Sequence, residues 1–159
     1  GVSVGDYDFV RPVALKIGFE QLFWKVKQKP GKPMFFAKSE RPDQNPCYLL
    51  GLPGNPAAVY IAMQIYVSTL ISTVQGQKQL PQWFSAVISH DLKVDSRERF
   101  LRMALSFDSG MLKLSSLPKQ QSHMLSNLMQ AKCIVRIPAA QNIHAGQIPQ
   151  GLYIYGSCH

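Results

Sequence analysis

A turn placed directly before a long apolar run sets the strongest limit on the fold of this chain. The turn is Leu52-Pro53-Gly54-Asn55-Pro56, and the run that follows extends to Val74. Asn55 can cap a helix whose first residue is Pro56, because the N–H that proline lacks would have no partner in a first helical turn. The sequence therefore predicts a helix from Pro56 to about residue 75. Its apolar positions nearly encircle it, so we expect it to be covered on more than one side.

The same stretch is long enough to be weighed as a membrane span, since residues 44–77 carry no formal charge. Five polar residues interrupt the apolar run, namely Gln64, Ser68, Thr69, Ser72 and Thr73. The Asn55-Pro56 start and the Gly76 stop are also typical of a globular helix. We therefore expect a buried helix and no membrane partner.

Helix and strand signals alternate before this helix. A short helix is predicted over residues 9–17, ending at Gly18, followed by strands over 21–28, 33–38 and 47–50 and a surface loop over 39–46. After Gly76 the pattern changes to strands over 85–94, 99–107, 111–117, 132–137 and 152–155, with one helical turn over 122–130. The predicted fold class is α/β followed by β. One domain is expected over residues 1–78 and a small β-barrel or sandwich over residues 79–159.

The charge balance favours an anionic partner. Seventeen Lys and Arg against nine Asp and Glu give a net charge of +8, which suits phosphates, oxyanions and nucleic acid alike. Cys47, Cys133 and Cys158 are odd in number and lack a C-x-x-C spacing, which argues against a disulfide framework and a zinc site. A cytoplasmic location is the expectation.

The positive charge is densest in residues 24–33, which hold four lysines. On a single strand Lys25, Lys27 and Lys29 would point to one face, because side chains alternate. Three ammonium groups on one face repel one another unless an anion lies between them, which favours a phosphate or oxyanion site. The alternative is a solvated edge strand that its lysines protect from aggregation.

The N-terminal segment offers a second anion site. Gly1 and Gly5 permit a backbone that presents N–H groups ahead of the predicted first helix. Asp6 and Asp8 flank Tyr7, and carboxylates beside a phosphate commonly hold Mg²⁺. The alternative is that Asp8 only caps the helix. The histidines lack the spacing of metal ligands, and Ser122-His123 is the one hydroxyl–imidazole pair that could face this site from the second domain.

Taken in order, the segments GVSVGDYDFV, FWKVKQKPGKP and LGLPGNPAAVY resemble the molybdopterin molybdenumtransferase family, which includes bacterial MoeA and the E domain of gephyrin. The resemblance implies part of a three-layer molybdopterin-binding α/β domain and then a small C-terminal β-barrel. It also implies an enzyme that inserts molybdenum from molybdate into adenylylated molybdopterin and releases AMP, with Mg²⁺ present, as a cytoplasmic homodimer.

Matched residue by residue, the resemblance assigns catalytic roles to Asp8, Lys25 and Lys29 and a metal to Asp6 and Asp8. Contacts to the substrate are assigned to Ser3, Gly5, Asp6, Lys32, Pro53, Asn55, Pro56 and Ser122. The family's dimerisation domains and half of the α/β domain would precede Gly1. We therefore expect the chain by itself to be inactive, with an unpaired sheet edge.

Two other functions fit parts of the pattern. A basic chain with a small barrel could bind nucleic acid, but stacking aromatics among the barrel strands are sparse after Trp83 and Phe84. A scaffold of the same fold could bind a partner peptide, although it would not need Lys25, Lys29 and Asp8. The pattern favours the enzyme, and no nucleic-acid partner is expected.

Overall fold

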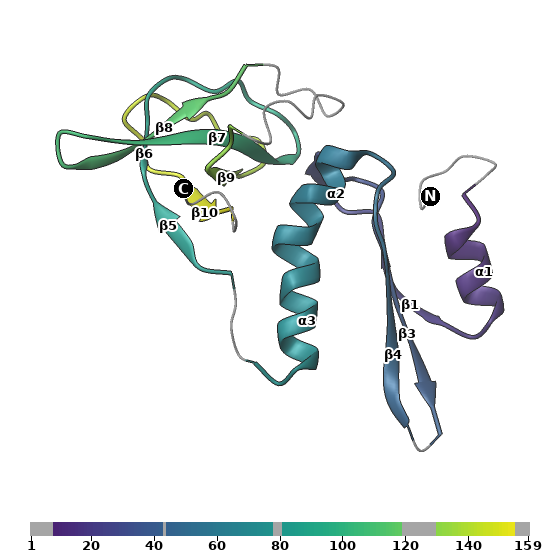
Figure 1. Cartoon of the computed structure of the whole chain (residues 1–159). Coiled ribbons are helices and arrows are strands. Elements are labelled where there is room, and N and C mark those ends of the chain that lie inside the picture. The colour runs from purple at the N-terminus through teal and green to yellow at the C-terminus, as the bar shows by residue number, and fades with distance from the viewer. Residues whose placement is uncertain (1–7, 43, 78–80, 119–129, 155–159) are drawn as a thin grey trace.

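The computed structural model describes residues 8–42, 44–77, 81–118 and 130–154. A long helix stands between a small sheet and a larger one (Figure 1). The small sheet is antiparallel, in the order β1 (Glu20–Trp24), β3 (Phe35–Arg41), β4 (Gln44–Gly51). The short helix α1 (Val10–Lys16) covers one face of it, where Ala14 packs with Phe35 and Ala37. The predicted first helix is confirmed, and Gly18 follows its end with a φ of +93°.

The long helix begins where the sequence predicts. It comprises α2 (Pro56–Ala62), a π-helical turn η1 (Met63–Val67) and α3 (Ser68–Val74). The Asn55 Oδ1 accepts hydrogen bonds from the backbone N–H groups of Ala57 at 3.1 Å and Ala58 at 3.3 Å. This side chain satisfies two of the N–H groups that a helix start leaves without a partner.

One side of this helix is buried against the larger sheet. Ile61 and Ile65 pack with Phe100, Ile134 and Leu152 of that sheet. By length and composition alone, residues 56–74 could also cross a membrane. The packing of its apolar residues accounts for this composition equally well, because the core helix of a folded domain is similarly apolar.

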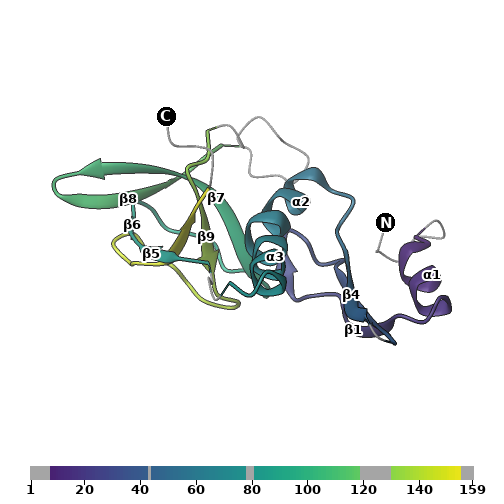
Figure 2. The same cartoon turned by 60° about the horizontal axis from the view of Figure 1, so that its bottom comes forward.

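The larger sheet has seven strands and is mixed. Its main path is β5 (Trp83–Ser85), β10 (Gln150–Tyr153), β9 (Cys133–Ile137), β7 (Glu98–Asp108), β8 (Met111–Ser116), β6 (Val87–Ile88). The seventh strand, β2 (Gln28–Lys29), comes from the first part of the chain and pairs with β7 in parallel. The sheet curls into a half-barrel around a core that contains Met103, Leu114 and Val135. Figure 2 shows the β7–β8 hairpin projecting away from the helix.

The single strand predicted over residues 21–28 is wrong. β1 ends at Trp24, because Lys25 adopts a φ of +68° that no regular strand accommodates. The backbone N–H groups of Lys25 and Val26 then donate to the carbonyls of Met34 at 2.7 Å and Lys32 at 2.9 Å, which closes a loop. Since Lys29 belongs to β2 in the other sheet, Lys25, Lys27 and Lys29 do not share one face of one strand.

Two further predictions about strands are wrong. Residues 39–46 are not a loop, because β3 and β4 continue as a hairpin with Arg41 opposite Gln44 and an irregularity after Ser39. Residues 85–94 are not one strand. β5 ends at Ser85, β6 covers only Val87 and Ile88, and Leu92 forms an isolated bridge with Ile143. The helical turn predicted over 122–130 lies outside the described residues except for Gln130.

Candidate functional site

The loop between β1 and β3 packs closely on the start of the long helix. Gly31 is buried in this loop and has a φ of +98°. A Cβ atom added there would lie 2.9 Å from the Gln28 Nε2 and 3.8 Å from Pro53 Cγ and Ala58 Cβ. Only glycine fits both this backbone conformation and this space. The loop therefore packs directly against Pro53 and the first turn of α2.

Gln28 fixes this loop from within. It is 2% exposed, its Nε2 donates to the Pro30 carbonyl at 3.1 Å, and its Oε1 accepts a hydrogen bond from the Tyr66 hydroxyl of η1. Burial, followed by the negative charge of Glu98, raises the pKa of Tyr66 above its usual value, so the phenol remains a donor. Sequence reasoning missed Gln28, because a glutamine between two lysines gives no sign of burial.

Lys29 is held by a carboxylate from the second part of the chain. Its Nζ lies 3.0 Å from the Asp95 Oδ2. The Asp95 Oδ1 accepts from the backbone N–H of Arg97 at 3.1 Å and lies 3.4 Å from its Nε. The Lys29 ammonium and then the Arg97 N–H lower the pKa of Asp95 to about 2, so this carboxylate is ionised at neutral pH.

A second concentration of positive charge surrounds Trp24 at the end of β1. The Lys25 Nζ lies 3.9 Å and the Arg11 Cζ 4.3 Å from the centre of its ring. The Arg11 Nε also donates to the Gln21 Oε1 at 2.7 Å. Within the described part of the chain, neither cation contacts a carboxylate. The indole face holds both charges at one edge of the small sheet. Arg11 was not predicted, although its place three residues after Asp8 was visible in the sequence.

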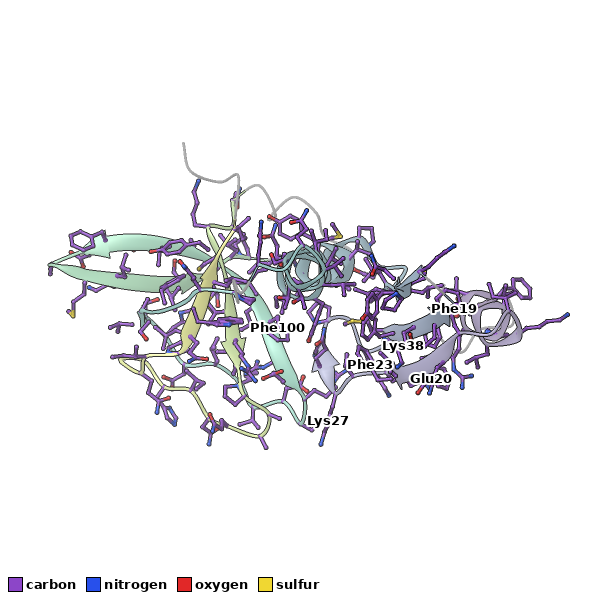
Figure 3. All side chains as sticks on the ribbon, turned by 90° about the horizontal axis from the view of Figure 1, so that it is seen from below. Phe19, Glu20, Phe23, Lys27, Lys38 and Phe100 are labelled. Carbon is purple, nitrogen blue, oxygen red and sulfur yellow. The ribbon has the colours of Figure 1, made fainter. Side chains whose placement is uncertain are left out.

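Lys27 and Lys32 are exposed on the same loop. Figure 3 shows Lys27 beside β2, apart from Lys38 and Glu20 of the small sheet. Lys38 is engaged elsewhere, because its Nζ lies 3.0 Å from Glu40 and 3.6 Å from Glu20. The loop after β1 therefore presents Lys25, Lys27 and Lys32 without a carboxylate partner among the residues described.

An aromatic cleft of about 840 Å³ lies between the small sheet, the long helix and the larger sheet. Phe23, Phe36 and Tyr48 line it from the small sheet, and Trp83 and Phe100 from the other side. Phe23 and Phe100 are marked on the two sides in Figure 3. At its rim, the Arg136 Nε and the Glu98 Oε1 form an ion pair at 2.5 Å.

Comparison with known proteins assigns the chain to a family. Residues 1–73 match the family described as "Probable molybdopterin binding domain", and residues 85–148 match "MoeA C-terminal region (domain IV)". A protein named molybdopterin molybdenumtransferase, from Haemophilus influenzae, is 34% identical over 155 residues, covering 92% of this chain and 36% of that protein. The chain belongs to the MoeA family.

A further relative is similar to the chain in sequence, and a solved structure shares its fold. The Drosophila melanogaster protein named molybdenum cofactor synthesis protein cinnamon is 33% identical over 87% of this chain and 23% of that protein. A crystal structure of a Pyrococcus horikoshii moeA protein superposes with a TM-score of 0.70 at 19% identity, over 94% of this chain and 35% of that chain. The bacterial relatives named molybdopterin molybdenumtransferase are about three times as long as the part this chain spans, 36% and 35% of their lengths being covered.

The residues that the MoeA resemblance singled out are only partly brought together. Lys25, Lys29 and Lys32 lie on the loop that packs on Pro53, and Pro53 is buried beneath it. Asn55 is engaged in capping α2, and Pro56 is exposed at its first position. Ser3, Gly5, Asp6 and Ser122 lie outside the residues that the structure describes.

Asp8 is half-buried and precedes α1. The cap position of that helix is taken by Phe9, so Asp8 is not its capping residue. Across residues 8–42, 44–77, 81–118 and 130–154, no group of three or more His, Cys, Asp or Glu side chains could hold a metal ion. Of the two carboxylates that the resemblance assigns to Mg²⁺, the structure describes only Asp8.

Proposed function

We propose that this chain forms part of a molybdopterin molybdenumtransferase, which inserts molybdenum from molybdate into adenylylated molybdopterin and releases AMP. The observation that carries this proposal is the packing of the lysine-bearing loop on the Pro53 turn, where a Cβ added to Gly31 would lie 3.8 Å from Pro53 Cγ. This contact joins the two segments that the family resemblance assigned to one site. Two relatives named molybdopterin molybdenumtransferase, which are 34% and 29% identical, support the reaction class.

The chemistry that this surface can perform is the stabilisation of negative charge. Phosphate and molybdate oxygens develop negative charge in the transition state of the transfer. Positioned cations lower the energy of that transition state without a covalent nucleophile. In this proposal Lys25 and Lys29 bind these oxygens, with Lys32 beside them. Arg11 adds a fourth cation through its contact with Trp24.

The remaining assignments rest on the family resemblance. Pro53, Asn55 and Pro56 would shape the pocket, with Ser3, Gly5, Asp6 and Ser122 contributing contacts. Mg²⁺ would be held by Asp6 and Asp8, but since the described residues supply only one of these carboxylates we assign no step to the metal. A three-layer α/β domain containing residues 1–78, a barrel containing residues 79–159, a homodimer and a cytoplasmic location belong to the same proposal.

The test is molybdate-dependent AMP release from adenylylated molybdopterin. A full-length protein that contains this segment should release AMP, and the 159-residue chain alone should not. In the full-length protein, Lys25→Ala and Lys29→Ala should each lower the rate by about 100- to 1,000-fold, the range found when a charge-stabilising donor is removed. Lys16→Ala is the matched control, because Lys16 is exposed and lies at the last position of α1, away from Arg11 at its start. Unchanged AMP release in the Lys25→Ala Lys29→Ala double variant would refute the enzyme proposal.

A further inference from the structure

Arg99 is a half-buried cation with two buried nitrogen donors that lack an acceptor among the residues described. It lies on β7 directly opposite Lys29 in the parallel pairing of β2 with β7. Its Nε and Nη2 groups are buried and meet no acceptor among the residues described. Leaving buried donors of a charged group without a partner is unfavourable, so an acceptor within reach would stabilise this side chain.

Asp95 is a carboxylate whose negative charge acts on Arg99. It pairs with Lys29, the neighbour of Arg99, and its charge opposes the effect of burial, which lowers the pKa of Arg99. The Asp95 backbone is fixed, because its carbonyl accepts from the Ala140 N–H at 2.8 Å. Its Oδ1 is also anchored, by the Arg97 N–H at 3.1 Å. The Oδ2, which is 3.0 Å from the Lys29 Nζ, is the oxygen whose partner would change.

We propose that Arg99 is the alternative partner of the Asp95 carboxylate, which leaves Lys29 for Arg99 when an anion binds to that lysine. The exchange breaks no covalent bond, and after it Lys29 is paired with the anion and Asp95 with Arg99. Arg99 is then a positioning residue that acts through Asp95 and does not touch the anion. The link to an anion rests on the proposed function, in which Lys29 binds a phosphate or molybdate oxygen.

The exchange can be tested without any ligand. In Lys29→Ala, Asp95 loses its lysine, so the Arg99 Nε–H resonance should move downfield as it gains a carboxylate acceptor. The shift should be absent in Lys29→Ala Asp95→Asn. The Arg136 Nε–H, which bonds to Glu98 in every variant, serves as an internal reference. An Arg99 resonance that does not respond to Lys29→Ala would overturn the exchange, whatever the fate of the proposed function.

Anion binding then tests its consequence. AMP and molybdate are titrated separately by calorimetry, which distinguishes a phosphate from a molybdate site. Arg99→Met should weaken binding about fivefold, because Asp95 keeps hold of Lys29, and Asp95→Asn should strengthen it about as much. In the Asp95→Asn background Arg99→Met should change nothing, and Arg99→Lys should behave as the unmodified chain. An equal loss in both backgrounds would mean that Arg99 contacts the anion or only stabilises the fold, which would overturn the proposal.

Failure of the proposed function looks different. If Lys29→Ala leaves the affinity for AMP and for molybdate unchanged while the Arg99 resonance still shifts, the carboxylate exchange holds and Lys29 is not an anion ligand. Thermal unfolding of each variant identifies any that are unfolded. If Arg99→Met is unfolded, Arg99→Gln, which keeps a long polar side chain without the charge, supplies the same comparison.

Discussion

The Tyr66 hydroxyl donates a hydrogen bond to the side-chain carbonyl of Gln28, and this contact joins the long helix to a loop 38 residues earlier in the chain. Gln28 also bonds to the Pro30 carbonyl and pairs through its backbone with Glu98 of β7. One buried amide therefore links the helix, the lysine-bearing loop and the larger sheet. The position of Lys29 depends on it, since the two residues form β2 together.

Tyr66→Phe should lower the free energy of unfolding by about 1–3 kcal/mol, because the Gln28 Oε1 would remain buried without a donor. Urea unfolding followed by circular dichroism measures this loss. Tyr153→Phe is the control, since Tyr153 is 45% exposed and its ring contact with Phe84 survives the substitution. Equal losses in the two variants would contradict the role assigned to the Gln28–Tyr66 bond.

Gly31→Ala should destabilise the chain more than Gly18→Ala. Both glycines have a positive φ, of +98° and +93°, which costs a Cβ-bearing residue roughly 1 kcal/mol or more. Only at Gly31 would the added Cβ also meet a neighbour, the Gln28 Nε2 at 2.9 Å, adding roughly 1–3 kcal/mol of overpacking. Melting temperatures of the two variants give the comparison. A Gly31→Ala chain as stable as Gly18→Ala would show that the loop does not press on Gln28.

Asn55→Ala should cost about 1 kcal/mol, the usual effect of losing a helix cap. Asn55→Asp keeps an oxygen acceptor for the N–H groups of Ala57 and Ala58, so it should lose much less. Denaturant midpoints at neutral pH separate the two variants. If Asn55→Asp were as unstable as Asn55→Ala, the side-chain oxygen would not be what starts the helix.

Arg11→Gln and Lys25→Ala should each weaken AMP binding and reduce its dependence on salt concentration, because each removes a cation from the Trp24 ring. The chain has two tryptophans, so in a Trp83→Phe background the fluorescence of Trp24 reports on its own surroundings. We expect AMP to change this emission in the parent and much less in either variant. Lys16→Ala should match the parent. A response to AMP that Arg11→Gln and Lys25→Ala also leave unchanged would place the anion elsewhere.

The ion pair of Asp95 predicts a loss of stability in acid. Its pKa is about 2 in the folded chain against an ordinary value of 3.8, and a lowered pKa means that the folded state favours the ionised carboxylate. The contribution is complete above about pH 4 and disappears as the pH falls toward 2. Asp95→Asn should therefore show a flatter decline in melting temperature over this range. Parallel declines in the two proteins would mean that the Lys29–Asp95 contact is too weak to matter.

Local sequence signals predicted the helices well, because the groups that start and stop a helix are close in sequence. Asn55 and Pro56 set the start of the long helix, and Gly18 follows the end of α1. The strand predicted over residues 21–28 failed for a different reason. The alternation of side chains does not reveal that Lys25 has a φ of +68°. That conformation is stabilised by the hydrogen bond from the Lys25 N–H to the Met34 carbonyl, which lies nine residues later.

The candidate site was predictable as a set of cations but not as an arrangement. Lys25 and Lys29 were identified from their spacing and from the family resemblance. Their partners were not, because Asp95 lies 66 residues from Lys29 and joins it only after the two sheets have formed. Arg11 likewise reaches Trp24 through the packing of α1, which no pattern in the first helix specifies.

The pairing of β2 with β7 places a strand from the first part of the chain in the sheet that the second part forms. Such a contact forms late in folding, because the entropy of closing a long loop is lost before the strands can pair. The pairing also raises the contact order of the whole chain. The chain therefore does not divide into two independent sheets at residues 78–80, where its sequence pattern changes. If the chain is divided between Gln77 and Pro81, the two polypeptides should associate in solution. The first carries β2, and the larger sheet of the second lacks this strand.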